Sequence, residues 1–226
     1  MIKFGGPVFE SSGDPRAVAK AHKAKGYTAA YAPWGLKPGE TERIKAIREA
    51  FAAEDIIIAE VGYWENLVDL DGETRKKNMA AMTDALYLAD ELGARCAVDI
   101  FGSYVRGKGD ASFSAKNFSE DAFADAVDIA RLLIDTVKPK TAYFTYEIFA
   151  FNIVDSPETL ERLIKAVERE KYRKKYVEIR NYDQIFCADL HDFRRICRGR
   201  INKQRHNRLA ENPDCDRQKS GNQNHK

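Results

Sequence analysis

Regular alternation of β-forming runs with amphipathic helical patterns restricts the fold of this chain more than any other feature. The β-forming runs lie at 2–4, 27–31, 56–61, 95–100 and 141–146. Helical patterns follow them at 14–25, 39–53, 73–92, 119–137 and 156–170. Strands that alternate with helices form parallel sheets, and no Gly-x-Gly-x-x-Gly turn of a dinucleotide fold is present. We therefore predict an α/β fold of the (β/α)8 TIM-barrel type.

Capping signals mark the ends of several predicted helices. Asp14-Pro15 and Ser156-Pro157 each place a capping side chain before a proline that needs no N–H. Gly26 and Gly93 follow two helical patterns and lead directly into β-forming runs. These signals predict tight connections between helix and strand.

The predicted barrel is incomplete. A whole barrel takes about 250 residues and eight units, whereas the pattern supplies five, or six if 176–179 is a strand. From Lys171 onward the chain holds 15 of its 37 Lys and Arg but 7 of its 35 Asp and Glu. We predict a barrel portion over 1–170 and a basic, low-aliphatic tail over 171–226 that is disordered or non-native.

Composition excludes several classes of protein. The 226 residues are 44% hydrophobic, which is ordinary for a globular chain, and no apolar run approaches the roughly 18 residues of a membrane helix. The start lacks the pattern of a signal peptide, and four cysteines are too few for a disulfide scaffold. We expect a cytoplasmic protein with reduced thiols and no membrane partner.

The loops after the predicted strands supply the candidate site residues, because barrels place their active sites there. Aromatic and oxygen-bearing side chains in these loops suit a sugar or polyol. We predict substrate-binding roles for Trp34, Glu60, Trp64, Asn66, Gly102 and Ser103. A structural role is the alternative for each: the tryptophans would cap the barrel interior, Glu60 would bind backbone N–H groups, and Gly102-Ser103 would form a plain turn.

Glu147 is the strongest single candidate. It ends the apolar run 141–146, where an ionised carboxylate must be solvated, paired or bound to a metal. We predict a catalytic and metal-binding role for it. By contrast, we expect Asp69 and Asp71 to lie at the solvated start of a helix, and His22 to lie on the surface.

Several segments together resemble a known family over about residues 1–170. They are Glu60-Val-Gly-Tyr-Trp-Glu-Asn-Leu-Val-Asp69, Arg75, Ala89-Asp-Glu-Leu-Gly-Ala94, Gly102-Ser103, Tyr146-Glu147 and Asp155-Ser156-Pro157-Glu158. This set is similar to the sugar phosphate isomerase/epimerase family of xylose isomerase-like barrels, whose superfamily includes endonuclease IV-type repair enzymes. The resemblance implies a divalent metal, Mn²⁺, Mg²⁺ or Co²⁺, held by Glu, Asp, His and Glu after strands five to eight. Glu147 matches the first ligand.

The other three ligands have no match. The Leu-Asp-Pro-x-Asn pattern of the family's sixth strand is missing, Asp183 and Glu178 are weak substitutes, and His191 arrives too early to end strand seven. The resemblance implies an isomerase or epimerase of carbohydrate metabolism that moves a proton next to a carbonyl of a sugar or sugar phosphate. We expect this activity to be impaired in this chain.

Three interpretations of the basic tail remain open. It could be the product of a shifted reading frame, a basic arm that binds nucleic acid, or a Cys/His metal site. Two alternative functions remain. The basic tail suggests a nucleic-acid-binding or endonuclease IV-like protein. The exposed strand edges of an incomplete barrel suggest a non-catalytic partial barrel that pairs with another chain, which could be a second copy of the same chain, a homo-oligomer.

Overall fold

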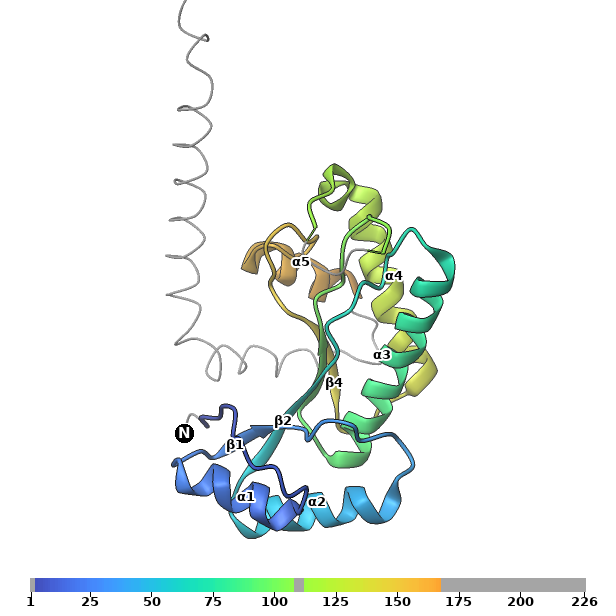
Figure 1. The fold of residues 1–226 in the computed structure, drawn as a ribbon. Coiled ribbons are helices and arrows are strands. Elements are labelled where there is room, and N and C mark those ends of the chain that lie inside the picture. Colours follow the sequence, from blue (N-terminus) through green and yellow to red (C-terminus); the bar gives the residue numbers. More distant parts are fainter. Residues whose placement is uncertain (1–2, 108–111, 168–226) are drawn as a thin grey trace, which may run out of the picture. The chain divides into compact units, whose positions relative to one another are not determined.

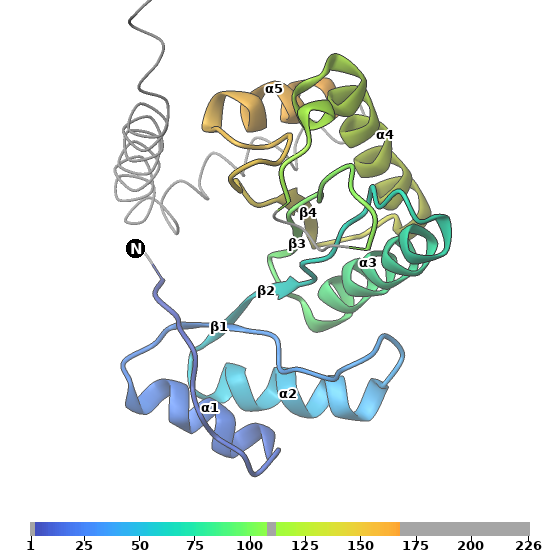
Figure 2. The ribbon, with the colours of Figure 1, turned by 45° about the horizontal axis from the view of Figure 1, so that its top comes forward.

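Four parallel strands and the helices between them form the described part of the chain. In the computed structural model, residues 3–107 and 112–167 are described. The strands are β1 (Ala29–Tyr31), β2 (Ile57–Gly62), β3 (Cys96–Asp99) and β4 (Tyr143–Tyr146), in the order β1-β2-β3-β4. The helices are α1 (Pro15–Ala24), α2 (Thr41–Ala53), α3 (Gly72–Leu92), the short 3₁₀ helix η1 (Ala115–Phe118), α4 (Glu120–Val137) and α5 (Pro157–Val167). Figures 1 and 2 show this succession.

This architecture confirms the predicted α/β class, a parallel sheet whose strands alternate with helices. The predicted strand at 2–4 is not confirmed, because residues 3 and 4 form no strand and residues 1–2 lie outside the described part. The Phe4 carbonyl nevertheless accepts hydrogen bonds from the N–H groups of Thr28 and Ala29. The segment therefore lies beside the entry to β1 without joining the sheet.

Local capping chemistry is confirmed at several helix ends. The Asp14 side chain accepts from the Arg16 N–H, with Pro15 at the first helical position. The Ser156 hydroxyl accepts from the Thr159 N–H at 3.2 Å, and Gly93 ends α3 with φ at +68°. Asp71 caps the start of α3 as predicted, because its carboxylate accepts from the Thr74 N–H at 3.0 Å.

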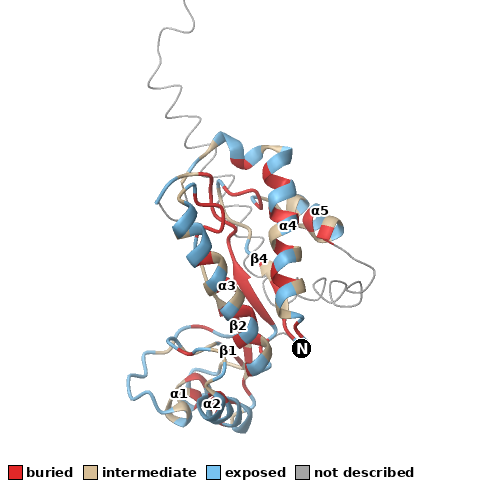
Figure 3. Ribbon diagram, turned by 90° about the vertical axis from the view of Figure 1, so that its right-hand side faces the viewer, coloured by how far each residue is buried: buried red, intermediate tan, exposed pale blue. Residues whose placement is uncertain are grey.

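The core lies between the sheet and the helices that pack on it, among them α2, α3 and α4, as the buried segments in Figure 3 indicate. Leu86 and Met82 of α3 and Leu133 of α4 are almost fully buried there. Val61, Ala97 and Phe144 come from three neighbouring strands, pair with one another in register and belong to this core. The neighbouring register row of Glu60, Cys96 and Tyr143 consequently faces the other side of the sheet.

Two predictions about surface residues are wrong. His22 is only 5% exposed, because its ring packs against Tyr27 and Phe51 and its Nδ1 lies 2.9 Å from the Val18 carbonyl. Asp69 is only 2% exposed, and its Oδ1 accepts hydrogen bonds from the N–H groups of Asp71 and Gly107. Tertiary contacts therefore bury both side chains despite their polar sequence neighbours.

Candidate active site

An irregularity in the pairing of β1 with β2 sets the direction of Glu60. Ala30 pairs with Ile58, but the next residue of β1, Tyr31, pairs with Glu60, so the register advances by one residue on β2. Ile58 and Val61 both belong to the core between the sheet and the helices. In a regular strand, two residues three apart in sequence would face opposite sides of the sheet. The irregularity thus lets Glu60 face away from this core between two core residues.

Glu60 is a carboxyl group held in an unusual environment. It is only 5% exposed, and within the described residues its side chain forms no hydrogen bond or ion pair. Burial, with the charge of Glu147 as a second and smaller cause, raises the pKa of Glu60 to about 7. The carboxyl is therefore partly protonated near neutral pH and can both donate and accept a proton.

Glu147 follows β4 directly, as predicted, and lies in the loop at the carboxyl edge of the sheet. Its backbone N–H donates to the Asp99 carbonyl at 2.7 Å, which extends the pairing of β3 with β4 by one step. The carboxylate is exposed, and its Oε2 accepts a hydrogen bond from Nε1 of Trp64 at 2.8 Å. The structure therefore brings Trp64 and Glu147 together, with Glu60 close enough to feel the charge of Glu147.

Asn66, Gly102 and Ser103 form a second group, held together by buried hydrogen bonds. The Asn66 side chain donates to the Ser103 carbonyl at 2.8 Å and accepts from the N–H groups of Ser103 and Val68. Asn117 joins the group, because its Nδ2 donates to the Ser103 hydroxyl at 2.8 Å. We call Asn66, Gly102, Ser103 and Asn117 the loop network. It ties the loop after β2 to the loop after β3.

Gly102 is required by this arrangement. Its φ of +99° is one that side-chain-bearing residues rarely adopt, and a Cβ at this position would lie 2.1 Å from Oδ1 of Asn66. The backbone of the loop after β3 can therefore approach Asn66 only because residue 102 has no side chain.

Trp34 belongs to neither group. It lies in the loop after β1, is 83% exposed, and makes no hydrogen bond or ring contact within the described residues. Asp99, the last residue of β3, is not among the predicted site residues, yet it ties the loop after β2 to β3: its buried Oδ1 accepts from the N–H groups of Ile100 and Glu65. The bond to Glu65 depends on the pairing of β3 with β2, which a sequence pattern does not contain.

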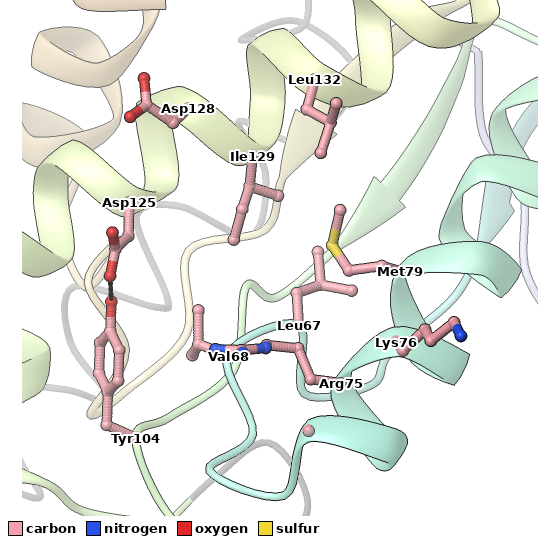
Figure 4. A pocket seen from close by; sticks show the side chains of 11 residues that line it. Leu67, Val68, Arg75, Lys76, Met79, Tyr104, Asp125, Asp128, Ile129 and Leu132 are labelled. Atoms are coloured by element: carbon pink, nitrogen blue, oxygen red, sulfur yellow. Dashed lines mark hydrogen bonds between the residues drawn. The ribbon is translucent and has the colours of Figure 1, made fainter.

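A groove in the described residues lies elsewhere. It has a volume of about 420 Å³ and is lined by residues of α3, α4 and the adjoining loops, including Met79, Ile129 and Leu132 (Figure 4). The Tyr104 hydroxyl donates a hydrogen bond to Asp125 at one end of it. None of the predicted site residues lines this groove, so it is separate from the carboxylates at the sheet edge.

The potential metal ligands are incomplete in the part of the chain that the structure describes. No group of three or more His, Cys, Asp or Glu side chains there is arranged to hold a metal ion. The exposed Glu147 carboxylate has the oxygen chemistry that Mg²⁺ and Mn²⁺ prefer, and it could supply one ligand. The weak substitutes Glu178 and Asp183, and His191, which arrives too early to match a ligand, lie outside the described residues. Among the described helices, none is long and apolar enough to cross a membrane.

Comparison with known proteins gives a family and a fold. A family model described as xylose isomerase-like TIM barrel matches residues 18–173. A solved L-ribulose 3-epimerase is similar with a TM-score of 0.54 and 13% identity, over 75% of this chain and 58% of that one. A probable 3-DHS dehydratase, AsbF, of petrobactin synthesis from Bacillus anthracis has a TM-score of 0.51 and 12% identity, over 72% of this chain and 56% of that one. No curated protein matches.

Proposed function

Because the chain belongs to the xylose isomerase-like TIM barrel family, we propose that its site is that of a sugar or sugar phosphate isomerase or epimerase. The reaction class is proton transfer next to a carbonyl. The observation that carries the proposal is the position of Glu147, an exposed carboxylate directly after β4, whose charge acts on the buried carboxyl of Glu60 within β2. A carboxylate at the carboxyl edge of a parallel sheet, with a second carboxyl group under its influence, suits acid–base chemistry on a polyol.

Glu147 is assigned as the catalytic and metal-binding residue. A divalent cation, Mn²⁺, Mg²⁺ or Co²⁺, supplies polarisation of the substrate carbonyl when it is bound. Glu147 would contribute one carboxylate oxygen to such a cation, while Trp64 binds the other oxygen. Glu60, with its pKa of about 7, offers a substrate hydroxyl either a hydrogen-bond donor or an acceptor.

The remaining residues predicted to bind substrate fall into two classes, the aromatic side chains and the buried polar residues of the loops. Trp34 and Trp64 supply aromatic surfaces against which the apolar face of a sugar ring or chain can pack. Asn66, Gly102 and Ser103 act on substrate through the loops that they shape, because their buried polar groups bind one another.

We expect weak or absent turnover from these 226 residues. Within the described part, Glu147 is the one residue that matches the family's ligand set, and the chain spans less than three fifths of the length of the two solved structures. The proposed substrate is a free small molecule in the cytoplasm. Pairing with another chain would use open sheet edges, and binding of nucleic acid would use the basic residues 171–226.

The proposal is tested by Mn²⁺ titration of the full chain, followed by electron paramagnetic resonance of free Mn²⁺. We expect binding that Glu147→Gln weakens at least tenfold and that Glu158→Gln, a change near the start of α5, leaves unchanged. Epimerisation of a panel of ketoses and ketose phosphates is assayed in parallel. Mn²⁺ binding that is the same in Glu147→Gln would overturn the role of Glu147, and rapid metal-dependent turnover would overturn the expected impairment.

A further inference from the structure

We propose that Trp64 is a positioning residue that holds the Glu147 carboxylate in one orientation. The Nε1–H of Trp64 donates to Oε2 of Glu147 at 2.8 Å, although 83 residues separate the two in the chain. The consequence for metal binding rests on the proposed function, whereas the contact itself does not. The indole N–H group can only donate a hydrogen bond, so it requires an acceptor such as this carboxylate.

The backbone on both sides of Trp64 is fixed to β3. The Tyr63 N–H donates to the Val98 carbonyl at 2.9 Å, and the Glu65 N–H donates to Oδ1 of the buried Asp99 at 3.2 Å. Trp64 therefore projects from a segment that is anchored one residue before it and one residue after it. An anchored backbone reduces the conformational entropy lost when the indole binds its partner.

Gly62 provides the space for the indole ring. A Cβ at residue 62 would lie 2.0 Å from Cη2 of Trp64 and 2.4 Å from its Cζ3, so the six-membered ring lies directly on the backbone of the last residue of β2. The φ of Gly62 is not in the left-handed region, so it is this close approach that requires glycine here. The ring contact and the anchored backbone together aim Nε1–H at Glu147, the residue that follows β4.

The hydrogen bond from Trp64 makes the two carboxylate oxygens of Glu147 different from each other. Oε2 accepts from Trp64, whereas Oε1 accepts no hydrogen bond within the described residues. A hydrogen bond from a neutral donor to a carboxylate is stronger than one between two neutral groups, and it fixes the plane of the carboxylate. Oε1 is thereby presented to a cation or a substrate hydroxyl. Partners of this kind behind a metal ligand typically change metal affinity by about 10- to 100-fold.

Nuclear magnetic resonance of the indole N–H groups tests the contact without any metal or substrate. The chain has two tryptophans, so ¹⁵N-Trp labelling gives two indole signals, and Trp34→Phe assigns them. We expect the Trp64 signal to exchange slowly with water and to shift when Glu147 is changed to Ala, while the Trp34 signal exchanges fast and stays in place. Because Glu147 is exposed, this substitution leaves the fold intact. A Trp64 signal that is unmoved in Glu147→Ala would overturn the proposal.

Mn²⁺ affinity then tests the positioning role. Trp64→Phe keeps an aromatic ring but removes the donor, and Gly62→Ala keeps the donor but displaces the ring. We expect each to weaken Mn²⁺ binding about tenfold while the circular dichroism spectrum is retained, and Trp34→Phe to have no effect. Unchanged affinity in Trp64→Phe, or a loss that only parallels unfolding, would contradict the positioning role. If the wild-type chain binds no Mn²⁺, the proposed function fails, and the indole signals still decide whether Trp64 holds Glu147.

Discussion

The loop network joins the loops after β2 and β3, whereas Glu60 lies within β2 and Glu147 directly follows β4, and the two sets satisfy their polar groups in opposite ways. In the loop network, the side chains of Asn66, Ser103 and Asn117 bind one another and the neighbouring backbone. Glu60 is also buried but forms no hydrogen bond within the described residues, and the Glu147 carboxylate is exposed. The difference separates groups that build the loops from groups that remain available to a ligand.

The largest expected effect comes from breaking the loop network at Gly102. Gly102→Ala introduces a Cβ 2.1 Å from Oδ1 of Asn66 in a left-handed backbone conformation. We expect a loss of about 3–5 kcal/mol in the free energy of unfolding, measured by urea denaturation. Gly13→Ala is the matched control, because Gly13 also has a positive φ of +71°, but a Cβ added there would meet no atom within 4 Å. Equal losses in the two variants would show that the approach of Asn66 is unimportant.

Removing the Asn66 side chain tests the same network without adding a clash. Asn66→Ala leaves the N–H groups of Val68 and Ser103 and the Ser103 carbonyl without their present partner. The expected cost is about 2–4 kcal/mol, again by urea denaturation. Asn66→Asp keeps the acceptor and loses the donor, so its cost should lie between those of wild type and Asn66→Ala. A loss below about 0.5 kcal/mol in Asn66→Ala would contradict the structural role.

Glu60 should destabilise the fold at high pH, in contrast to the loop network. Its pKa rises from an ordinary 4.5 to about 7 in the folded chain, so folding favours the protonated form. The contribution of Glu60 to the free energy of unfolding is therefore greatest below about pH 4.5, and this contribution is lost as the pH rises through 7. We expect Glu60→Gln to be up to about 3 kcal/mol more stable than wild type at pH 8 and nearly equal to it at pH 4.5.

The measurement is thermal unfolding of wild type and Glu60→Gln across pH 4.5 to 8. Glu147→Gln serves as the comparison, because its charge is the second cause of the raised pKa and burial is the first. That variant should reduce the pH dependence without abolishing it. A stability difference between wild type and Glu60→Gln that does not vary with pH would show that Glu60 is not buried as described.

The smallest effect on stability is expected at Trp34. With 83% of its surface exposed, Trp34→Ala should change the free energy of unfolding by less than about 0.5 kcal/mol. If the side chain packs against the sugar, the same variant should weaken sugar binding, measured by saturation transfer in nuclear magnetic resonance. Unchanged sugar binding would remove Trp34 from the proposed site.

Local chemistry explains why part of the fold is predictable. The caps at Asp14 and Ser156 and the left-handed Gly93 depend on residues within one turn, so sequence patterns identify them. The prediction for His22 is wrong because lysines surround it in sequence, at positions 20, 23 and 25, while its own side chain turns toward Phe51 of another helix. The burial of such a residue depends on helix packing that a single pattern does not contain.

The site is predictable only as a set of residues. Position after a strand correctly identifies Trp64, Asn66, Gly102, Ser103 and Glu147 as loop residues, whereas Glu60, which is predicted in the same set, lies within β2. Their division into two groups depends on the register shift between β1 and β2, on the missing Cβ of Gly102 and on Asn117, which belongs to η1. These are long-range features, so no signal in the sequence separates loop-building residues from the carboxyl groups.

The most direct test of the division is paramagnetic broadening by substoichiometric Mn²⁺ in the ¹³C-carboxyl and side-chain amide spectra of the full chain. Glu60→Gln and Glu147→Gln assign the two carboxyl signals, and Asn66→Asp assigns its amide. The account predicts that the Glu147 signal broadens first, then that of Glu60, while Asn66 in the loop network is affected last. A sharp Glu147 signal, or earliest broadening at Asp125 and Asp128 of the groove, would contradict it.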